Sequence, residues 1–231
     1  MTGIRDDQEA RVVDELEIIG WGRTADVYAL PGDDAWVLRR NRDGGGTARE
    51  AEVMTRLARQ GYPVPAVLRA EGPDLVMERL AGPSLLDALL AGTYEPEPAG
   101  ALIAELLARL HALPGSPPAH LDLHPGNVLL TAHRGPVVID WETAEEGHPP
   151  GLDHAMSALL LAEVAVSPAP YAPGARAGLA ALLSAATVPV LPHIGTARVR
   201  RAADPNLTEG EVAALGAAAD LVTELAASRE A

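Results

Sequence analysis

The stretch Ala119–Leu130, AHLDLHPGNVLL, places two histidines, an aspartate and an asparagine within eight residues and then becomes purely apolar. The Pro-Gly pair predicts a turn, and the apolar run after it predicts a short strand. Three interpretations are open at this point. His120, Asp122 and His124 alternate as the ligands of a metal such as zinc would on a strand, the loop could be a plain structural turn, or it could be a catalytic loop.

A second acidic position favours the catalytic loop. Asp140 ends the next apolar run, PVVID, thirteen residues after Asn127. The carboxylate of Asp122 could orient a hydroxyl and accept its proton. Asn127 and Asp140 offer the hard oxygen ligands that Mg²⁺ prefers when substrate phosphates complete its coordination. The order His-x-Asp-x₄-Asn followed by a strand-end Asp is typical of the catalytic and metal loops of kinases.

HLDLHPGNVLL and VVIDWE together resemble the H-G-D-x-H-x-x-N and I-D-W/F-E/D strings of the aminoglycoside phosphotransferase and choline kinase group, within the protein-kinase-like fold. Leu121 departs from the pattern, where a small residue is usual. The resemblance implies a buried scaffolding role for His120, acceptor activation by Asp122, and Mg²⁺ binding by Asn127 and Asp140. His124 stays open between touching the transferred phosphate and bracing the loop.

The surrounding pattern predicts an α+β chain of two lobes. Residues 16–40 contain three short apolar runs separated by turn signals, a helical pattern covers 47–60, and a strand pair follows within 65–80. The chain is rich in helical patterns from residue 81 onward, and Ser84 and Thr208 are expected helix caps. We therefore expect a small β-rich N-terminal lobe, residues 1–80, that binds nucleotide, and a helical C-terminal lobe, residues 81–231, that holds the catalytic and acceptor sites.

The resemblance also implies nucleotide-binding residues in the N-terminal lobe. The string IIGWGRTADVYAL offers Gly20 and Gly22 as a glycine loop over phosphates, with Val27 against the adenine. Arg39 stands where kinases carry the lysine that holds the phosphates, and Glu50 is its expected partner on the helix. Within this resemblance, Glu52 is expected on the solvated face of the helix. The alternative for the glycine string is a plain hairpin turn. The alternative for Arg39 and its neighbour Arg40 is that both face solvent.

Three further elements complete the comparison. DLVMERL resembles the segment between the lobes, which implies Met77 behind the adenine and backbone bonds from Glu78 and Leu80 to its edge. Asp153 either braces the catalytic loop through backbone N–H groups or is an ordinary acid in the first turn of a helix. Arg198, Arg200 and Arg201 are expected to form a solvated cluster, and contact with a phosphate or an anionic substrate is the alternative.

Composition narrows the class of protein. The net charge is −14, and residues 81–231 carry 7 Arg against 17 acidic residues, which argues against binding to nucleic acid and suits a cationic acceptor. The chain has no cysteine, so disulfides and thiolate metal sites are excluded. Its first residues lack the apolar core of a signal peptide and its apolar runs are too short to span a bilayer, so we expect a cytoplasmic protein that does not bind membranes.

The sequence thus predicts a small-molecule kinase that uses ATP or GTP with Mg²⁺ to phosphorylate a hydroxyl, and an aminoglycoside or another cationic acceptor fits its charge. The chain lacks the activation segment of a regulated protein kinase between Asp140 and Asp153. Only about 90 residues follow Asp140. We therefore expect a small or open acceptor site, or one completed by a second subunit, and the oligomeric state is open. The alternative is a catalytically inactive kinase-fold protein that binds a nucleotide or another ligand.

Overall fold

The structure is a computed structural model that describes residues 16–22 and 24–228. The first residues of the chain, for which the sequence predicts no signal peptide, lie outside the described residues up to residue 15. The described chain divides into two compact units, and each is treated by itself. The first contains residues 16–59 and 64–80, and the second contains residues 60–63 and 81–228.

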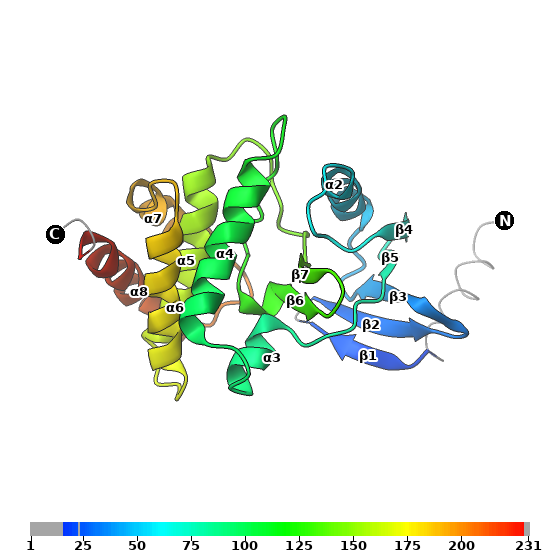
Figure 1. Ribbon diagram of the computed structural model, residues 1–231, viewed down its shortest axis with the longest axis horizontal. Coiled ribbons are helices and arrows are strands. Elements are labelled where there is room, and N and C mark those ends of the chain that lie inside the picture. The colour runs from blue at the N-terminus through cyan, green and yellow to red at the C-terminus, as the bar shows by residue number, and fades with distance from the viewer. Residues whose placement is uncertain (1–15, 23, 229–231) are drawn as a thin grey trace. The chain divides into compact units, whose positions relative to one another are not determined.

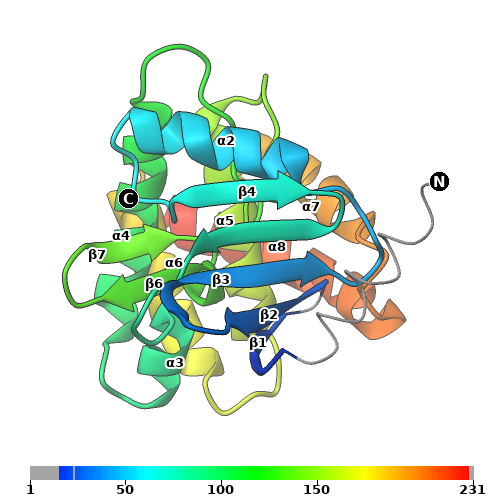
Figure 2. The same ribbon diagram turned by 90° about the vertical axis from the view of Figure 1, so that its right-hand side faces the viewer.

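The first unit is built on one antiparallel sheet of five strands, in the order β1-β2-β3-β5-β4 (Figure 2). Short turns join β1 to β2, β2 to β3 and β4 to β5, whereas β3 and β5 are neighbours that the chain connects through α2 and β4. Gly32 and Gly72 have positive φ in two of these turns, a conformation that glycine adopts without steric cost. The strands are β1 (Ile18–Trp21), β2 (Ala25–Leu30), β3 (Asp33–Asn41), β4 (Val67–Glu71) and β5 (Asp74–Glu78).

A single helix, α2 (Ala48–Arg59), follows β3 and packs against β4 (Figure 2). Its apolar residues recur at helical spacing, so Ala51, Met54 and Leu57 are buried on one side. Glu50 is buried on the same helix, while Glu52 is exposed. One acid of this helix is therefore directed into the first unit and the other into solvent.

The second unit consists of a short β-hairpin and a set of helices (Figure 1). Its hairpin joins β6 (Val128–Thr131) to β7 (Gly135–Val138), and η1 (Pro125–Asn127) leads directly into β6. The helical elements are α3 (Leu85–Leu90), α4 (Pro96–His111), α5 (Pro150–Ala165), α6 (Ala172–Ala185), η2 (Leu191–His193), α7 (Ile194–Ala202) and α8 (Glu209–Ala227).

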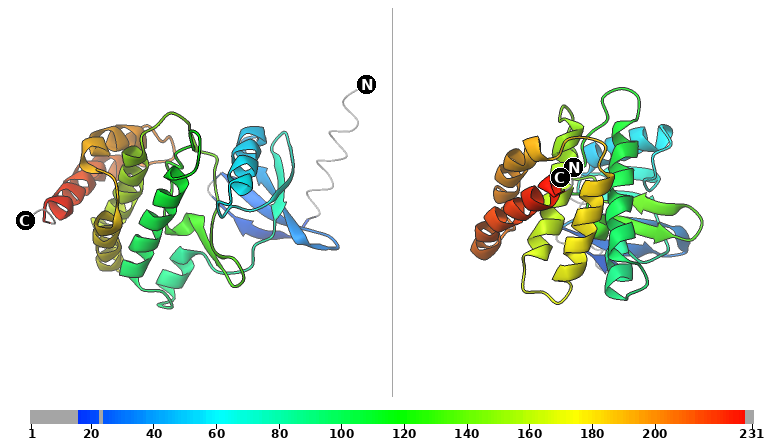
Figure 3. Two further views of the ribbon diagram at one scale, coloured as in Figure 1. Left: turned by 45° about the horizontal axis from the view of Figure 1, so that its top comes forward. Right: turned by 60° about the vertical axis from the view of Figure 1, so that its left-hand side comes forward.

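Helix α5 is the core of this unit, and α4, α6, α7 and α8 pack around it (Figure 3). Its residues from Gly151 to Ala162 are all buried, which explains why its sequence is apolar on every side. Helices α4 and α6 approach closely, because a Cβ on Gly100 would lie only 1.9 Å from the carbonyl oxygen of Gly178. No helix in the described ranges is long and apolar enough to cross a membrane.

The expected α+β fold class is confirmed, and so are the details that rest on local chemistry. Ser84 and Thr208 both cap their helices through complete capping boxes, with Asp87 and Glu211 as the reciprocal partners. The helix inserted after the third strand and the antiparallel sheet are as the sequence predicts.

Candidate active site

The polar loop Ala119–Leu130 runs from an isolated bridge at Ala119 through η1 into β6. Ala119 pairs with Glu145 in both directions, with N–O distances of 2.8 and 3.0 Å. The N–H of Ile139 donates to the carbonyl of Asn127 at 3.0 Å, which ties the end of the loop to the segment that carries Asp140. The loop is thus fixed at both ends by backbone hydrogen bonds.

Asp153, in the first turn of α5, fixes the loop in the middle. Its carboxylate is fully buried and accepts the N–H of His120 at 2.9 Å and the N–H of Leu121 at 2.8 Å. His111, at the end of α4, supplies a third contact at 2.8 Å through Nε2. Of the two interpretations of Asp153 given by the sequence, the brace of this loop through backbone N–H groups is therefore confirmed.

The ring of His120 is a structural part of the loop. It is fully buried, its Nε2 lies 3.1 Å from the carbonyl oxygen of Ile139, and its Nδ1 accepts the N–H of Asp122 at 3.3 Å. The ring also lies against Trp141, with centroids 4.6 Å apart. Because both ring nitrogens bond to backbone groups, the scaffolding role is confirmed and the zinc interpretation loses its first ligand.

Two residues of this region adopt a left-handed backbone conformation that is rare for residues with a side chain. The φ angle is 65° at Leu121 and 63° at Asp140. This conformation costs roughly 1–2 kcal/mol per residue, which explains why a small residue is usual at the position of Leu121. Burying a leucine side chain returns about 1.5–3 kcal/mol. Since Leu121 is only 2% exposed, its burial offsets the backbone cost.

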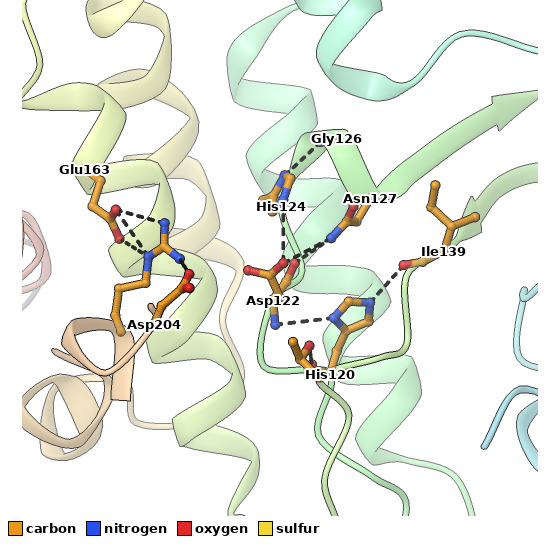
Figure 4. Close-up of polar contacts among 10 residues, drawn as sticks. His120, Asp122, His124, Gly126, Asn127, Ile139, Glu163 and Asp204 are labelled. Carbon is orange, nitrogen blue, oxygen red and sulfur yellow. Dashed lines mark hydrogen bonds and ion pairs between the residues drawn. The ribbon is translucent and has the colours of Figure 1, made fainter. Parts of the chain in front are cut away.

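The surroundings of Asp122 raise the pKa of its carboxyl group. Its pKa is raised to about 6, mainly by burial; the nearby charges of Asp140 and Asp204 also raise the pKa, while His120 and Arg201 lower it. Figure 4 shows its carboxylate between His124 and Asn127. A carboxylate with a raised pKa in a polar loop is characteristic of a general base.

Asn127 connects Asp122 to the segment of Asp140. Its Nδ2 donates to the backbone carbonyl of Asp122 at 2.9 Å and lies 3.5 Å from Oδ2 of the same residue. Since the amide nitrogen faces Asp122, the amide oxygen is turned away from it. That oxygen and the carboxylate of Asp140 have the donor chemistry that suits Mg²⁺.

The expectation of a solvated arginine cluster is wrong for two of its members. Arg200 donates to both carboxylate oxygens of Glu145, at 2.8 and 3.1 Å. Arg201 bonds Glu163 at 2.9 Å and Asp204 at 2.7 Å (Figure 4 labels both acids). Charge pairing explains the difference, because acidic residues are in excess in this part of the chain and neutralise the arginines that the fold half buries.

In the first unit, Arg39 and Glu50 form a buried ion pair, with both residues less than a tenth exposed. Arg40 is directed elsewhere and bonds both oxygens of Asp74 at 2.6 Å, as the alternation of side chains along a strand requires. Gly20 is paired with Val27 across β1 and β2, and Val37 with Met77 across β3 and β5. The sequence-predicted residues of this unit therefore lie on neighbouring strands and on α2, except Gly22 and Leu80, which follow β1 and β5.

Several contacts that shape the site were not anticipated. His111 meets Asp153 across 42 positions of sequence, and Thr143 donates to the carbonyl of His120 at 2.9 Å. Only the position of His111 at the end of a predicted helix is visible in the sequence, and no spacing rule links it to Asp153. Glu163 and Asp204 likewise reach the surroundings of Asp122 only through the packing of α5 and α7.

Comparison with known proteins agrees with this geometry. The model of the phosphotransferase enzyme family matches residues 15–121 and 118–188, and the chain belongs to that family. Among solved structures it resembles an ethanolamine kinase of Plasmodium vivax, with a TM-score of 0.61 and 13% sequence identity over 91% of this chain and 84% of that one. This likeness shows a shared kinase-like fold. No curated protein matches the sequence.

We expect Asp153→Asn to destabilise the protein and to distort the catalytic loop. The asparagine amide would turn an N–H donor toward a site that now receives three donors, so the loss should be about 2–4 kcal/mol. Denaturant unfolding measures it. Asp220→Asn, the same exchange at an exposed position of α8, is the control, and equal stability of the two variants would contradict the brace.

Asp122→Asn should instead stabilise the folded protein at high pH. The folded-state pKa of Asp122, about 6, lies above the ordinary value of 3.8, so ionisation penalises the folded state and the penalty is complete above pH 6. The gain at pH 8 should be about 1–3 kcal/mol after allowance for solvent screening, and it should vanish near pH 4. A variant less stable than the parent at pH 8 would show that the carboxylate is not desolvated.

Proposed function

We propose that this phosphotransferase transfers the γ-phosphoryl group of ATP or GTP to a hydroxyl of a small molecule in the presence of Mg²⁺. The observation that carries the proposal is the carboxylate of Asp122, which is desolvated and set beside Asn127 on a loop that Asp153 fixes. A fixed loop suits phosphoryl transfer because this reaction depends on positioning and charge neutralisation.

Asp122 would accept the proton of the acceptor hydroxyl. As that oxygen forms a bond to the γ-phosphorus, the bond from phosphorus to the bridging oxygen breaks and the nucleoside diphosphate leaves. The proton remains on Asp122 until solvent removes it. A base with a pKa near 6 is ionised at neutral pH and still basic enough to take part in this transfer.

Asn127 and Asp140 are the proposed ligands of Mg²⁺, which when bound neutralises phosphate charge. The two residues are joined through the backbone bond between Ile139 and Asn127. Asp140 also stands in a left-handed conformation, and strained backbone of this kind concentrates at functional sites. These features support the assignment.

The residues of the first unit are proposed to bind the nucleotide. A Cβ on Gly20 or Gly22 would meet only ordinary contacts of 3.6 Å, and neither residue has positive φ. The described chain therefore does not itself require glycine there, which supports a loop that leaves room for phosphates. Arg39 would hold the phosphates with Glu50 as its partner.

Adenine binding is proposed for the neighbourhood of Val27, Met77 and the segment after β5. The N–H of Leu80 receives no hydrogen-bond partner from residues 16–22 or 24–228, so it is available to a base edge. The N–H of Glu78 already donates to Ala66 at 2.8 Å, so only the carbonyl of Glu78 would serve. The identity of the base, adenine or guanine, depends on such backbone contacts.

A cationic acceptor, such as an amino alcohol or an amino sugar, fits the charge around Asp122. Asp140 and Asp204 both act on its pKa as negative neighbours. The nearby arginine, Arg201, is already shared between Glu163 and Asp204. Acidic groups thus outnumber free positive charge on this side of the unit, which favours an ammonium group on the acceptor.

The alternative is a kinase-fold protein that binds nucleotide without transferring phosphate. A protein with that role would not need Asp122, Asn127 and Asp140 together, whereas this chain has all three. The presence of the complete set therefore supports the catalytic interpretation.

Incubation with Mg²⁺, ATP or GTP and a panel of amino-alcohol, amino-sugar and nucleoside acceptors should yield a product heavier by one phosphoryl group, detected by mass spectrometry. Asp122→Asn should lower turnover by a factor of about 10³ or more while nucleotide affinity is retained, because only the base is lost. Absence of product together with absence of Mg²⁺-dependent nucleotide binding would contradict the enzyme, and full turnover of the variant would contradict the role of Asp122.

A further inference from the structure

The ring of His124 is folded back onto its own loop. The backbone N–H of Gly126 donates to its Nδ1 at 3.0 Å, so Nδ1 carries no hydrogen. The neutral ring must then carry its hydrogen on Nε2. This nitrogen lies 3.9 Å from Oδ2 of Asp122, which is longer than a hydrogen bond and close enough for the carboxylate charge to orient the N–H group.

Gly126 makes this ring position possible. A Cβ at residue 126 would lie 2.8 Å from Cε1 and 3.1 Å from Nδ1 of His124, and its next neighbour would be a methyl of Leu86 at the ordinary distance of 3.8 Å. Gly126 does not have positive φ, so its backbone conformation is open to any residue. The approach of the His124 ring is therefore the reason that the chain needs glycine there.

The two oxygens of Asp122 have different surroundings. The amide nitrogen of Asn127 and the Nε2 of His124 both face Oδ2, whereas Oδ1 has no hydrogen-bond partner within the described ranges. A carboxylate can exchange its two oxygens by rotation about a soft torsion. Two donors on one side remove that freedom and present the other oxygen.

We infer that His124 is a positioning residue that, together with Asn127, holds Oδ2 of Asp122 so that Oδ1 accepts the proton of the acceptor hydroxyl. The inference rests on the proposed function, since it specifies which oxygen of the proposed base reacts. The proton moves from the acceptor to Oδ1 as the new oxygen–phosphorus bond forms and the nucleoside diphosphate leaves. His124 gives up no proton in this step, and its contribution is the orientation of Asp122.

Two amide substitutions of His124 distinguish the role of its Nδ1 from the role of its Nε2. The side chain of His124→Gln reaches the position of Nε2 and can place an N–H donor opposite Asp122. The shorter side chain of His124→Asn reaches only the position of Nδ1, where its oxygen can still accept the N–H of Gly126. The first variant keeps the contact with Asp122, and the second keeps the brace of the loop.

Hydrolysis of ATP with Mg²⁺, in which water is the acceptor, gives a readout that needs no known substrate. We expect His124→Asn to lower kcat by about 10- to 100-fold, the loss that a misplacement of the base by about 1 Å can cause, with KM for ATP almost unchanged. His124→Gln should remain within about fivefold of the parent. Equal activity of both variants and the parent would overturn the inference.

The substitution Gly126→Ala tests the position of the His124 ring independently. Its methyl group should displace the ring and lower kcat as His124→Asn does, but it should have no further effect in a His124→Ala background, because the coupling between the two positions is then absent. An equal loss from Gly126→Ala in both backgrounds would show that the glycine serves something other than His124.

Nitrogen NMR of the full chain labelled in its histidines decides the tautomer without any assay. The resonance of His124, identified by its absence from His124→Gln, should show an unprotonated Nδ1 and a protonated Nε2. A protonated Nδ1 would overturn the inference whether or not the protein turns over ATP. A parent protein that neither binds nor hydrolyses nucleotide would contradict the proposed function instead, and the NMR result would still decide the geometry of His124.

Discussion

The buried carboxylate of Asp153 is the constraint on which the site depends. It accepts two consecutive backbone N–H groups of the loop, from His120 and Leu121, and meets His111 from α4. Burial by itself raises the pKa of Asp153, but the hydrogen bond from His111 and the nearby histidine charges outweigh burial, so the net effect is a lowered pKa. The residue is thus an anion at neutral pH, which makes these hydrogen bonds strong.

The fold shifts the pKa values of Asp153 and Asp122 in opposite directions. Asp153 is surrounded by donors and its pKa is lowered, whereas Asp122 is desolvated with few donors and its pKa is raised to about 6. The first arrangement stabilises a charge permanently, and the second leaves a carboxylate ready to accept a proton. Leu121, whose backbone is left-handed, links the two groups, because its N–H donates to Asp153 and its neighbour in the sequence is Asp122, the proposed base.

Local chemistry made much of this structure predictable. Turn residues, apolar periodicity and capping residues located the strands and helices. Helix geometry implied that only one of Glu50 and Glu52 can pair with Arg39, and the family resemblance indicated Glu50, which the structure confirms. The family resemblance supplied the expected role for Asp153, which spacing alone left undecided. Contacts between residues that are distant in the sequence could not be predicted from turns, periodicity or the family resemblance. His111 reaches Asp153 because α4 packs against α5, and Arg201 reaches Glu163 because α7 packs against α5. Arg200 reaches Glu145 in the loop that precedes α5.

Leu121, which stands where a small residue is usual, also shows that packing cannot be predicted from the local sequence. The sequence shows a large residue where a small one is usual, and only the structure shows both the unfavourable φ angle and the buried side chain that offsets it. The preference for a small residue at this position can therefore be overridden when burial of a larger side chain offsets the backbone cost, and the local sequence does not show that burial.

In the proposed mechanism, one loop presents a base, Asp122, and a metal ligand, Asn127, as separate groups. An experimental structure with Mg²⁺ and a non-hydrolysable ATP analogue tests it most directly. The account predicts the metal at about 2.1 Å from the amide oxygen of Asn127 and from a carboxylate oxygen of Asp140, with Oδ1 of Asp122 outside the coordination sphere. Coordination of the metal by Asp122, with Asn127 outside the sphere, would contradict it.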